Sequence, residues 1–186
     1  MLKRFDHLGH ARALTWTCFH RREFLRVDRT RQWLVEAILD AQEAHGFRIW
    51  AWVFMPEHVH LIVLPSPRDD RVGPLLKSVK QSVSRRAVHW VRKNNPGSLA
   101  QMADVAPSGK TTYRFWQRGA GHDRNLFTAP AIWNMIDYVY QNPVRRGLVE
   151  RPEEWDWSSA RTYAKLREGP LPIDVESLPR LRARGV

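Results

Sequence analysis

The sequence has little cysteine and no long hydrophobic run. Cys18 is the single cysteine among 186 residues, which excludes an internal disulfide and a zinc site built from several cysteines. No apolar run approaches the roughly 20 residues that a membrane-spanning helix needs. The charged opening MLKRFDHLGHAR lacks the apolar core of a signal peptide. We therefore expect a cytoplasmic protein that does not contact a membrane.

Negative charge is also scarce. The chain has 19 Asp and Glu residues against 30 Lys and Arg residues, so its formal net charge is +11. Twenty-four of the cations are arginines, whose guanidinium groups bind phosphate through two hydrogen bonds and stack on bases. Aromatic residues make up 11% of the chain. Basic charge combined with aromatic side chains predicts a nucleic-acid-binding protein.

The order of the predicted elements indicates an α+β fold. We expect strands at 13–19, 47–54, 58–64, about 112–117 and about 120–127, and helices at 29–45, 74–92 and 128–141. This order is typical of a ferredoxin-like domain, in which helices pack on one side of a central antiparallel sheet. We place the domain at residues 1–168 and a C-terminal tail containing prolines and arginines at 169–186.

Two histidines interrupt the apolar stretch MPEHVHLIVLP at residues 55–65. Side chains two residues apart in a strand project from the same face, so His58 and His60 should lie side by side. Two neutral imidazoles at this spacing suit one divalent metal ion. The alternative is a hydrogen-bonded histidine pair at the start of a strand, with Glu57 as a partner. The sequence contains neither an HExxH motif nor a second HxT or HxS motif, which argues against a zinc protease and a two-histidine phosphoesterase.

A second candidate site lies in IWNMIDYVYQNPVRRGLV, residues 132–149. On a helix, Tyr138 and Asn142 are four residues apart and share one flank, whereas Tyr140 lies on the other flank. We interpret Tyr140 as a core or rim aromatic residue. A tyrosine hydroxyl can attack a phosphodiester, and a metal bound by the histidines would polarise that phosphate. Tyr138 is therefore the predicted nucleophile, Asn142 a third metal ligand and Tyr140 the rival nucleophile.

Three blocks in order carry a family resemblance: PEHVH before an apolar strand, FWQRGAGHDRNLF, and DYVYQNPVRRGLVERPEEWDWSSAR. Over residues 12–163 the chain resembles the IS200-like Y1 transposases, and among them the REP-associated tyrosine transposases. The resemblance implies an HUH endonuclease domain. It also implies cleavage of single-stranded DNA, often beside an imperfect hairpin, through a 5′-phosphotyrosine intermediate.

The resemblance also implies roles for individual residues. His58 and His60 would bind Mg²⁺ or Mn²⁺, Tyr138 would be the nucleophile, and Asn142 would occupy the third ligand position, where related enzymes often carry glutamine. Glu57 would orient a ligand histidine. Basic residues expected to contact DNA are Arg118, His122, Arg124, Arg145 and Arg146. The cations of helix 74–92 fit a solvated face or a DNA track equally well; they are Lys77, Lys80, Arg85 and Arg86.

Three functional hypotheses follow from these motifs. The first is a metal-dependent transposase-type endonuclease acting on single-stranded or hairpin DNA. The second is a hairpin DNA-binding protein of the same descent that has no chemistry. The third, a general RNA-binding domain, explains the charge and the aromatic residues but leaves both motifs as coincidences. The sequence is compatible with a monomer or a homodimer.

Overall fold

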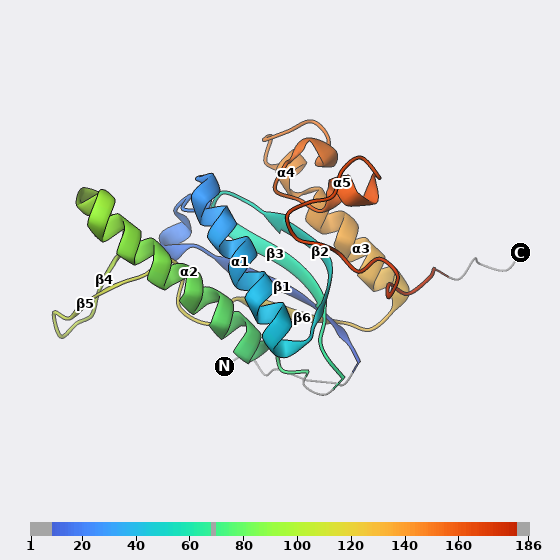
Figure 1. Cartoon of the computed structure of the whole chain (residues 1–186), viewed down its shortest axis with the longest axis horizontal. Coiled ribbons are helices and arrows are strands. Elements are labelled where there is room, and N and C mark those ends of the chain that lie inside the picture. Colours follow the sequence, from blue (N-terminus) through green and yellow to red (C-terminus); the bar gives the residue numbers. More distant parts are fainter. Residues whose placement is uncertain (1–8, 68–69, 182–186) are drawn as a thin grey trace, which may run out of the picture.

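The fold is built around a four-stranded antiparallel sheet with strand order β2-β3-β1-β6 (Figure 1). The computed structural model describes residues 9–67 and 70–181. The strands are β1 (Ala11–Thr17), β2 (Arg48–Phe54), β3 (His58–Leu64) and β6 (His122–Leu126). Helix α1 (Asp28–His45) connects β1 to β2, and α2 (Val72–Asn94) follows β3. The predicted α+β fold with a central antiparallel sheet is confirmed, and its strand order is that of a ferredoxin-like domain.

The remaining elements are short except for one helix. Helix α3 (Ala129–Tyr140) carries the two candidate tyrosines. The short elements are η1 (Phe19–Arg21), η2 (Pro96–Met102), β4 (Ala103–Val105), β5 (Thr111–Tyr113), α4 (Asn142–Arg145), η3 (Pro152–Glu154) and α5 (Ala160–Tyr163). The strand predicted at 112–117 is shorter than expected: only its first residues pair with β4, and Trp116 forms an isolated bridge with Cys18. No helix within the described ranges is long and apolar enough to cross a membrane.

Helices cover both faces of the sheet, so the expectation that they pack on one side is wrong. Figure 1 shows α1 and α2 side by side over one face. On that face Ile38 of α1 packs in a core that includes Leu61. On the other face α3 buries Ile136 in a second core that includes Ile62. The physical reason is that β2 and β3 are apolar on both faces, and both faces must be removed from water.

The ends of two helices follow from local signals in the sequence. Gly46 ends α1 in the left-handed conformation, with φ of 66°, as predicted from its position after the last apolar turn. The Thr128 side chain accepts a hydrogen bond from the Ala131 amide at the start of α3. Helix α1 was predicted to begin at residue 29, but it begins at Asp28, and Val27 occupies the cap position. The Asp28 carboxylate instead accepts a hydrogen bond from Arg31.

The segment expected as a C-terminal tail has no helix or strand over residues 169–181, but it packs closely on the domain. The Trp52 indole donates to the Leu171 carbonyl oxygen at 3.1 Å, and Leu171 is fully buried. The Asp174 amide donates to the Ile49 carbonyl oxygen at 2.7 Å. These contacts hold the segment against β2; residues 182–186 lie outside the described ranges.

The turn into β6 contains two glycines that should respond differently to substitution. Both have positive φ, 87° at Gly119 and 83° at Gly121. A Cβ at Gly121 would collide with the carbonyl oxygen of Thr15, whereas a Cβ at Gly119 meets no atom within 4 Å. We expect Gly119→Ala to lower the free energy of unfolding by about 1 kcal/mol and Gly121→Ala by roughly 3 kcal/mol. Urea denaturation of both variants measures this, and equal losses would contradict the close approach at Gly121.

Candidate active site

The two histidines lie in the middle of the sheet. Strand β3 is paired on both sides, and its His60 lies opposite Thr15 of β1 and Val53 of β2. This pairing fixes the backbone of both histidines. Their side chains project toward α3, as the period of two predicts, and the two Nε2 atoms are 3.0 Å apart. The ring planes of His58 and His60 are inclined at 83°, so the two nitrogens converge on one point.

The outer nitrogen of each ring is held by a hydrogen bond. His58 Nδ1 lies 3.1 Å from Glu57 Oε1, and His60 Nδ1 lies 2.9 Å from Thr15 Oγ1. Arg146 donates to the same Glu57 oxygen at 2.5 Å. The buried Glu57 Oε2 has no hydrogen-bond partner in the described part of the chain. The Glu57 carboxylate therefore holds the orientation of the His58 ring; its role behind a metal ligand stays a prediction.

Burial keeps both imidazoles neutral. Burial and the neighbouring His58 lower the pKa of His60 to about 3. Burial also lowers the pKa of His58, against the opposing effect of Glu57. Burial alone would raise the pKa of Glu57, but the hydrogen bond from Arg146 and the proximity of His58 hold it below its ordinary value. Neutral imidazole is the form that binds metal ions.

The residues present fit a divalent metal ion. Metal–imidazole bonds are about 2.1 Å long, so two Nε2 atoms 3.0 Å apart can both reach one ion. The Asn142 Nδ2 donates to the carbonyl oxygens of Tyr138 and Val139 at 3.0 and 3.2 Å. These two hydrogen bonds orient the Asn142 amide. Over the described ranges no group of three His, Cys, Asp or Glu residues could hold a metal ion. The candidate donors are therefore the two imidazoles, and the Asn142 carboxamide stays the predicted third ligand.

Tyr138 lies beside this pair on α3. Its ring is 49% exposed, and its centroid is 6.1 Å from that of His60. The Arg145 guanidinium lies over the Tyr138 ring at 4.3 Å and donates to the Tyr138 carbonyl oxygen at 2.5 Å. Tyr138 and His60 line a pocket of about 370 Å³ together with His122 and Arg124 of β6.

Tyr140 occupies a different environment. It is 8% exposed, and its hydroxyl is 3.0 Å from the Ser159 Oγ. Its ring packs edge-on against Tyr163, and burial raises its pKa. The structure therefore brings Tyr138 to the histidines and encloses Tyr140 in the core between α3 and the sheet.

The basic residues predicted to contact DNA fall into two places. His122, Arg124, Arg145 and Arg146 surround the histidine–tyrosine site. Arg118 instead lines a separate pocket beside α2 and forms an ion pair with Asp104 at 2.8 Å. Sequence reasoning missed Thr15, because only the pairing of β1 with β3 places its hydroxyl behind His60.

Comparison with known proteins shows which family this chain resembles. The family model described as "Transposase IS200 like" matches residues 10–103. A Haemophilus influenzae protein named as a candidate REP-associated tyrosine transposase is 27% identical, over 85% of this chain and 87% of its own length. The Escherichia coli REP-associated tyrosine transposase is 26% identical, over 77% of this chain and 71% of its own length.

The fold also matches a solved structure. A REP-associated tyrosine transposase bound to a REP hairpin superposes with a TM-score of 0.69 and 21% identity, covering 98% of this chain and 99% of that one. This likeness extends the agreement in fold beyond the region matched by the family model. Since that model alone matches half of the sequence, the chain belongs to the IS200-like transposase family.

Proposed function

We propose that the chain is a metal-dependent endonuclease and strand transferase that acts on single-stranded DNA through Tyr138. One observation carries the proposal: the His58 and His60 Nε2 atoms converge at 3.0 Å beside the half-exposed Tyr138 ring. A structural histidine pair would not need an exposed tyrosine next to it, and a general nucleic-acid-binding surface would need neither.

The ion assigned to this site is Mg²⁺ or Mn²⁺, with His58, His60 and Asn142 as ligands. Two nitrogens suit Mn²⁺, and the oxygens of a DNA phosphate make Mg²⁺ compatible as well. When bound, the ion polarises the scissile phosphate as a Lewis acid. Glu57 and Thr15 hold the two rings, so the ligand nitrogens need not reorganise when the ion arrives.

The chemical step is a transesterification. The Tyr138 oxygen attacks phosphorus and forms a new O–P bond, the bond from phosphorus to the 3′ oxygen breaks, and the proton lost by the phenol is taken up by that oxygen through solvent. The products are a 5′-phosphotyrosine and a free 3′-OH, and the reverse attack rejoins the strand. Arg145, stacked on the Tyr138 ring, and Arg146 supply positive charge where the phosphate gains negative charge.

The proposed substrate is DNA that carries a REP-like hairpin beside the single strand to be cut. Support comes from the net charge of +11 and from relatives named for their association with REP sequences. The experiment is incubation of the protein with a pool of labelled hairpin oligonucleotides and Mg²⁺ or Mn²⁺. We expect a DNA–protein adduct that survives denaturation and disappears with a metal chelator. Tight binding without an adduct under either metal would favour the hairpin DNA-binding protein instead.

Glu57 gives a test of the metal site that does not depend on cleavage. Glu57→Gln keeps the shape of the side chain but removes the negative charge behind His58. We expect Mn²⁺ affinity to fall by between about 10-fold and 100-fold, measured by calorimetric titration of the DNA-free protein. The matched control is Glu23→Gln, since Glu23 is an exposed carboxylate paired with Arg26. Equal Mn²⁺ affinity in the two variants would contradict the role of Glu57.

A further inference from the structure

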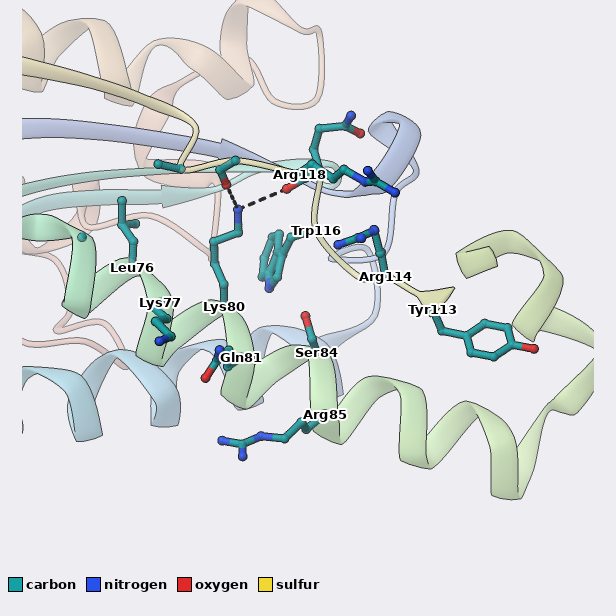
Figure 2. Close-up of a pocket in the computed structure, with 14 residues that line it drawn as sticks. Leu76, Lys77, Lys80, Gln81, Ser84, Arg85, Tyr113, Arg114, Trp116 and Arg118 are labelled. Atoms are coloured by element: carbon teal, nitrogen blue, oxygen red, sulfur yellow. Dashed lines mark hydrogen bonds between the residues drawn. The ribbon is translucent and has the colours of Figure 1, made fainter. Parts of the chain in front are cut away.

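A second pocket, of about 660 Å³, lies between α2 and the segment 113–120. Figure 2 shows side chains of α2 on one side and those of the segment on the other, facing into a shared space. The residues that carry the following inference are Lys77, Lys80, Arg85, Arg114, Trp116 and Arg118. None of them belongs to the histidine–tyrosine site.

The walls of this pocket carry an excess of positive charge. Arg114 and Arg118 both form ion pairs with one carboxylate, Asp104 of β4. Within the described ranges, neither Lys77 nor Arg85 forms an ion pair, and both remain available to an anion. One carboxylate therefore serves two arginines, and the cations of α2 are not neutralised.

Lys80 is a half-buried cation without a carboxylate partner in the described part of the chain. Its ammonium group donates to the carbonyl oxygens of Gln117 at 3.2 Å and Gly119 at 2.6 Å, and thereby ties α2 to the facing segment (Figure 2). Burial lowers the pKa of Lys80 to about 8. Two neutral carbonyl groups offset a buried charge only partly, so a nearby anion would stabilise the protonated form.

Trp116 offers an unused hydrogen-bond donor. The residue is 3% exposed, and its buried indole Nε1 has no hydrogen-bond partner among the residues that the structure describes. Buried donors without an acceptor are rare and cost free energy. In Figure 2 the ring lies between Lys80 and Arg114, with its nitrogen toward the α2 side of the pocket. Because the nitrogen is enclosed, a ligand oxygen would satisfy this donor only with a shift of the Trp116 ring toward the pocket.

We propose that this pocket binds the phosphodiester backbone of DNA at a second site, away from the histidine–tyrosine centre. Phosphate oxygens accept both from cations and from neutral donors such as an indole N–H. Lys77 and Arg85 are eight residues apart on α2, about 12 Å along the axis, so they span more than a single phosphate ion. The choice of DNA as the polymer rests on the proposed function.

The position of the pocket agrees with one continuous path for the substrate. The segment that forms its upper wall leads directly into β6, the edge strand of the sheet. The exposed His122 and Arg124 of β6 then line the pocket beside His60 on the opposite face. A DNA backbone held beside α2 would therefore pass around β6 to reach Tyr138, with cations along its course.

The test measures how DNA affinity depends on salt concentration, because the slope of this dependence reports the number of phosphate contacts. The variant is Lys77→Gln with Arg85→Gln, and the probe is a fluorescent hairpin oligonucleotide with a single-stranded flank, titrated between about 50 and 200 mM salt. The control is Lys165→Gln with Arg167→Gln, which removes the same charge in the segment that follows α5, where Arg167 pairs with Asp156. Figure 1 shows α5 far from α2. We expect the slope of log affinity against log salt to fall by about 1.8 in the first variant and to stay unchanged in the control.

A second variant tests the indole. Trp116→Phe removes the N–H group but no charge, so we expect affinity to fall about tenfold without a change of slope. Salt slopes of the Lys77 and Arg85 variant that match the control would overturn the second site. If the Trp116→Phe protein fails to fold, the variant with Lys77→Gln and Arg85→Gln still tests the second site.

This site and the proposed chemistry can fail separately. An altered salt slope with no adduct from the unmodified protein supports the second site and overturns the enzyme. An adduct together with an unaltered salt slope supports the enzyme and overturns the second site.

Discussion

We expect Tyr138→Phe to abolish the denaturation-resistant DNA adduct and Tyr140→Phe to retain it. The phenylalanine removes the attacking oxygen and leaves the ring between His60 and Arg145. Loss of a covalent nucleophile lowers the rate by at least about 10³-fold. The measurement is adduct yield against time with a labelled hairpin oligonucleotide and Mn²⁺, after equal binding of the oligonucleotide by both variants has been established.

Tyr140→Phe is the matched control because the change is chemically identical two residues away. It removes the hydrogen bond between the Tyr140 hydroxyl and the Ser159 Oγ, so its effect should be on stability, about 1 kcal/mol. An adduct formed by Tyr138→Phe and lost in Tyr140→Phe would reverse the assignment. It would also require α3 to turn in the complex, because Tyr140 is buried against Ser159 and Tyr163.

Replacement of either converging histidine has the second large effect. We expect His58→Ala and His60→Gln each to lower the rate of adduct formation by roughly 10³-fold, since a metal ion contributes several kcal/mol of transition-state stabilisation. Glutamine is chosen at position 60 because that side chain is buried and a cavity there would destabilise the sheet. Calorimetry should show the corresponding loss of Mn²⁺ binding in the DNA-free protein.

His45→Ala provides the control for the histidine variants. His45 lies at the exposed end of α1, where its ring contacts the Ser78 hydroxyl, and it is not part of the converging pair. Adduct formation and Mn²⁺ affinity should be unchanged. Wild-type Mn²⁺ affinity in both His58→Ala and His60→Gln would refute the metal site, even if cleavage were lost for another reason.

Much of the fold could be predicted from local sequence patterns, because each of these patterns involves residues that are close together in the chain. Gly46 ends a helix through its own positive φ, and Thr128 begins one through a hydrogen bond three residues ahead. The paired direction of His58 and His60 follows from the period of a strand. The shared flank of Tyr138 and Asn142 follows from the period of a helix.

The surroundings of the site depend on partners far away in the chain. Thr15 reaches His60 only through the register between β1 and β3. Arg146 reaches Glu57 across 89 residues. No local pattern encodes such distances, because they arise when separate elements pack together. The same holds for the second pocket, whose walls, α2 and the segment 113–120, are joined through Lys80.

The sequence by itself determined the chemistry available to this protein: two imidazoles on one face of a strand, a tyrosine and an amide on one flank of a helix, and a large positive charge. Only the tertiary structure decided which groups meet. It placed α3 on the face of the sheet opposite α1 and α2, because both faces of the central strands are apolar and must be buried. That placement brings Tyr138 beside His60, encloses Tyr140, and leaves the cations of α2 on the far side.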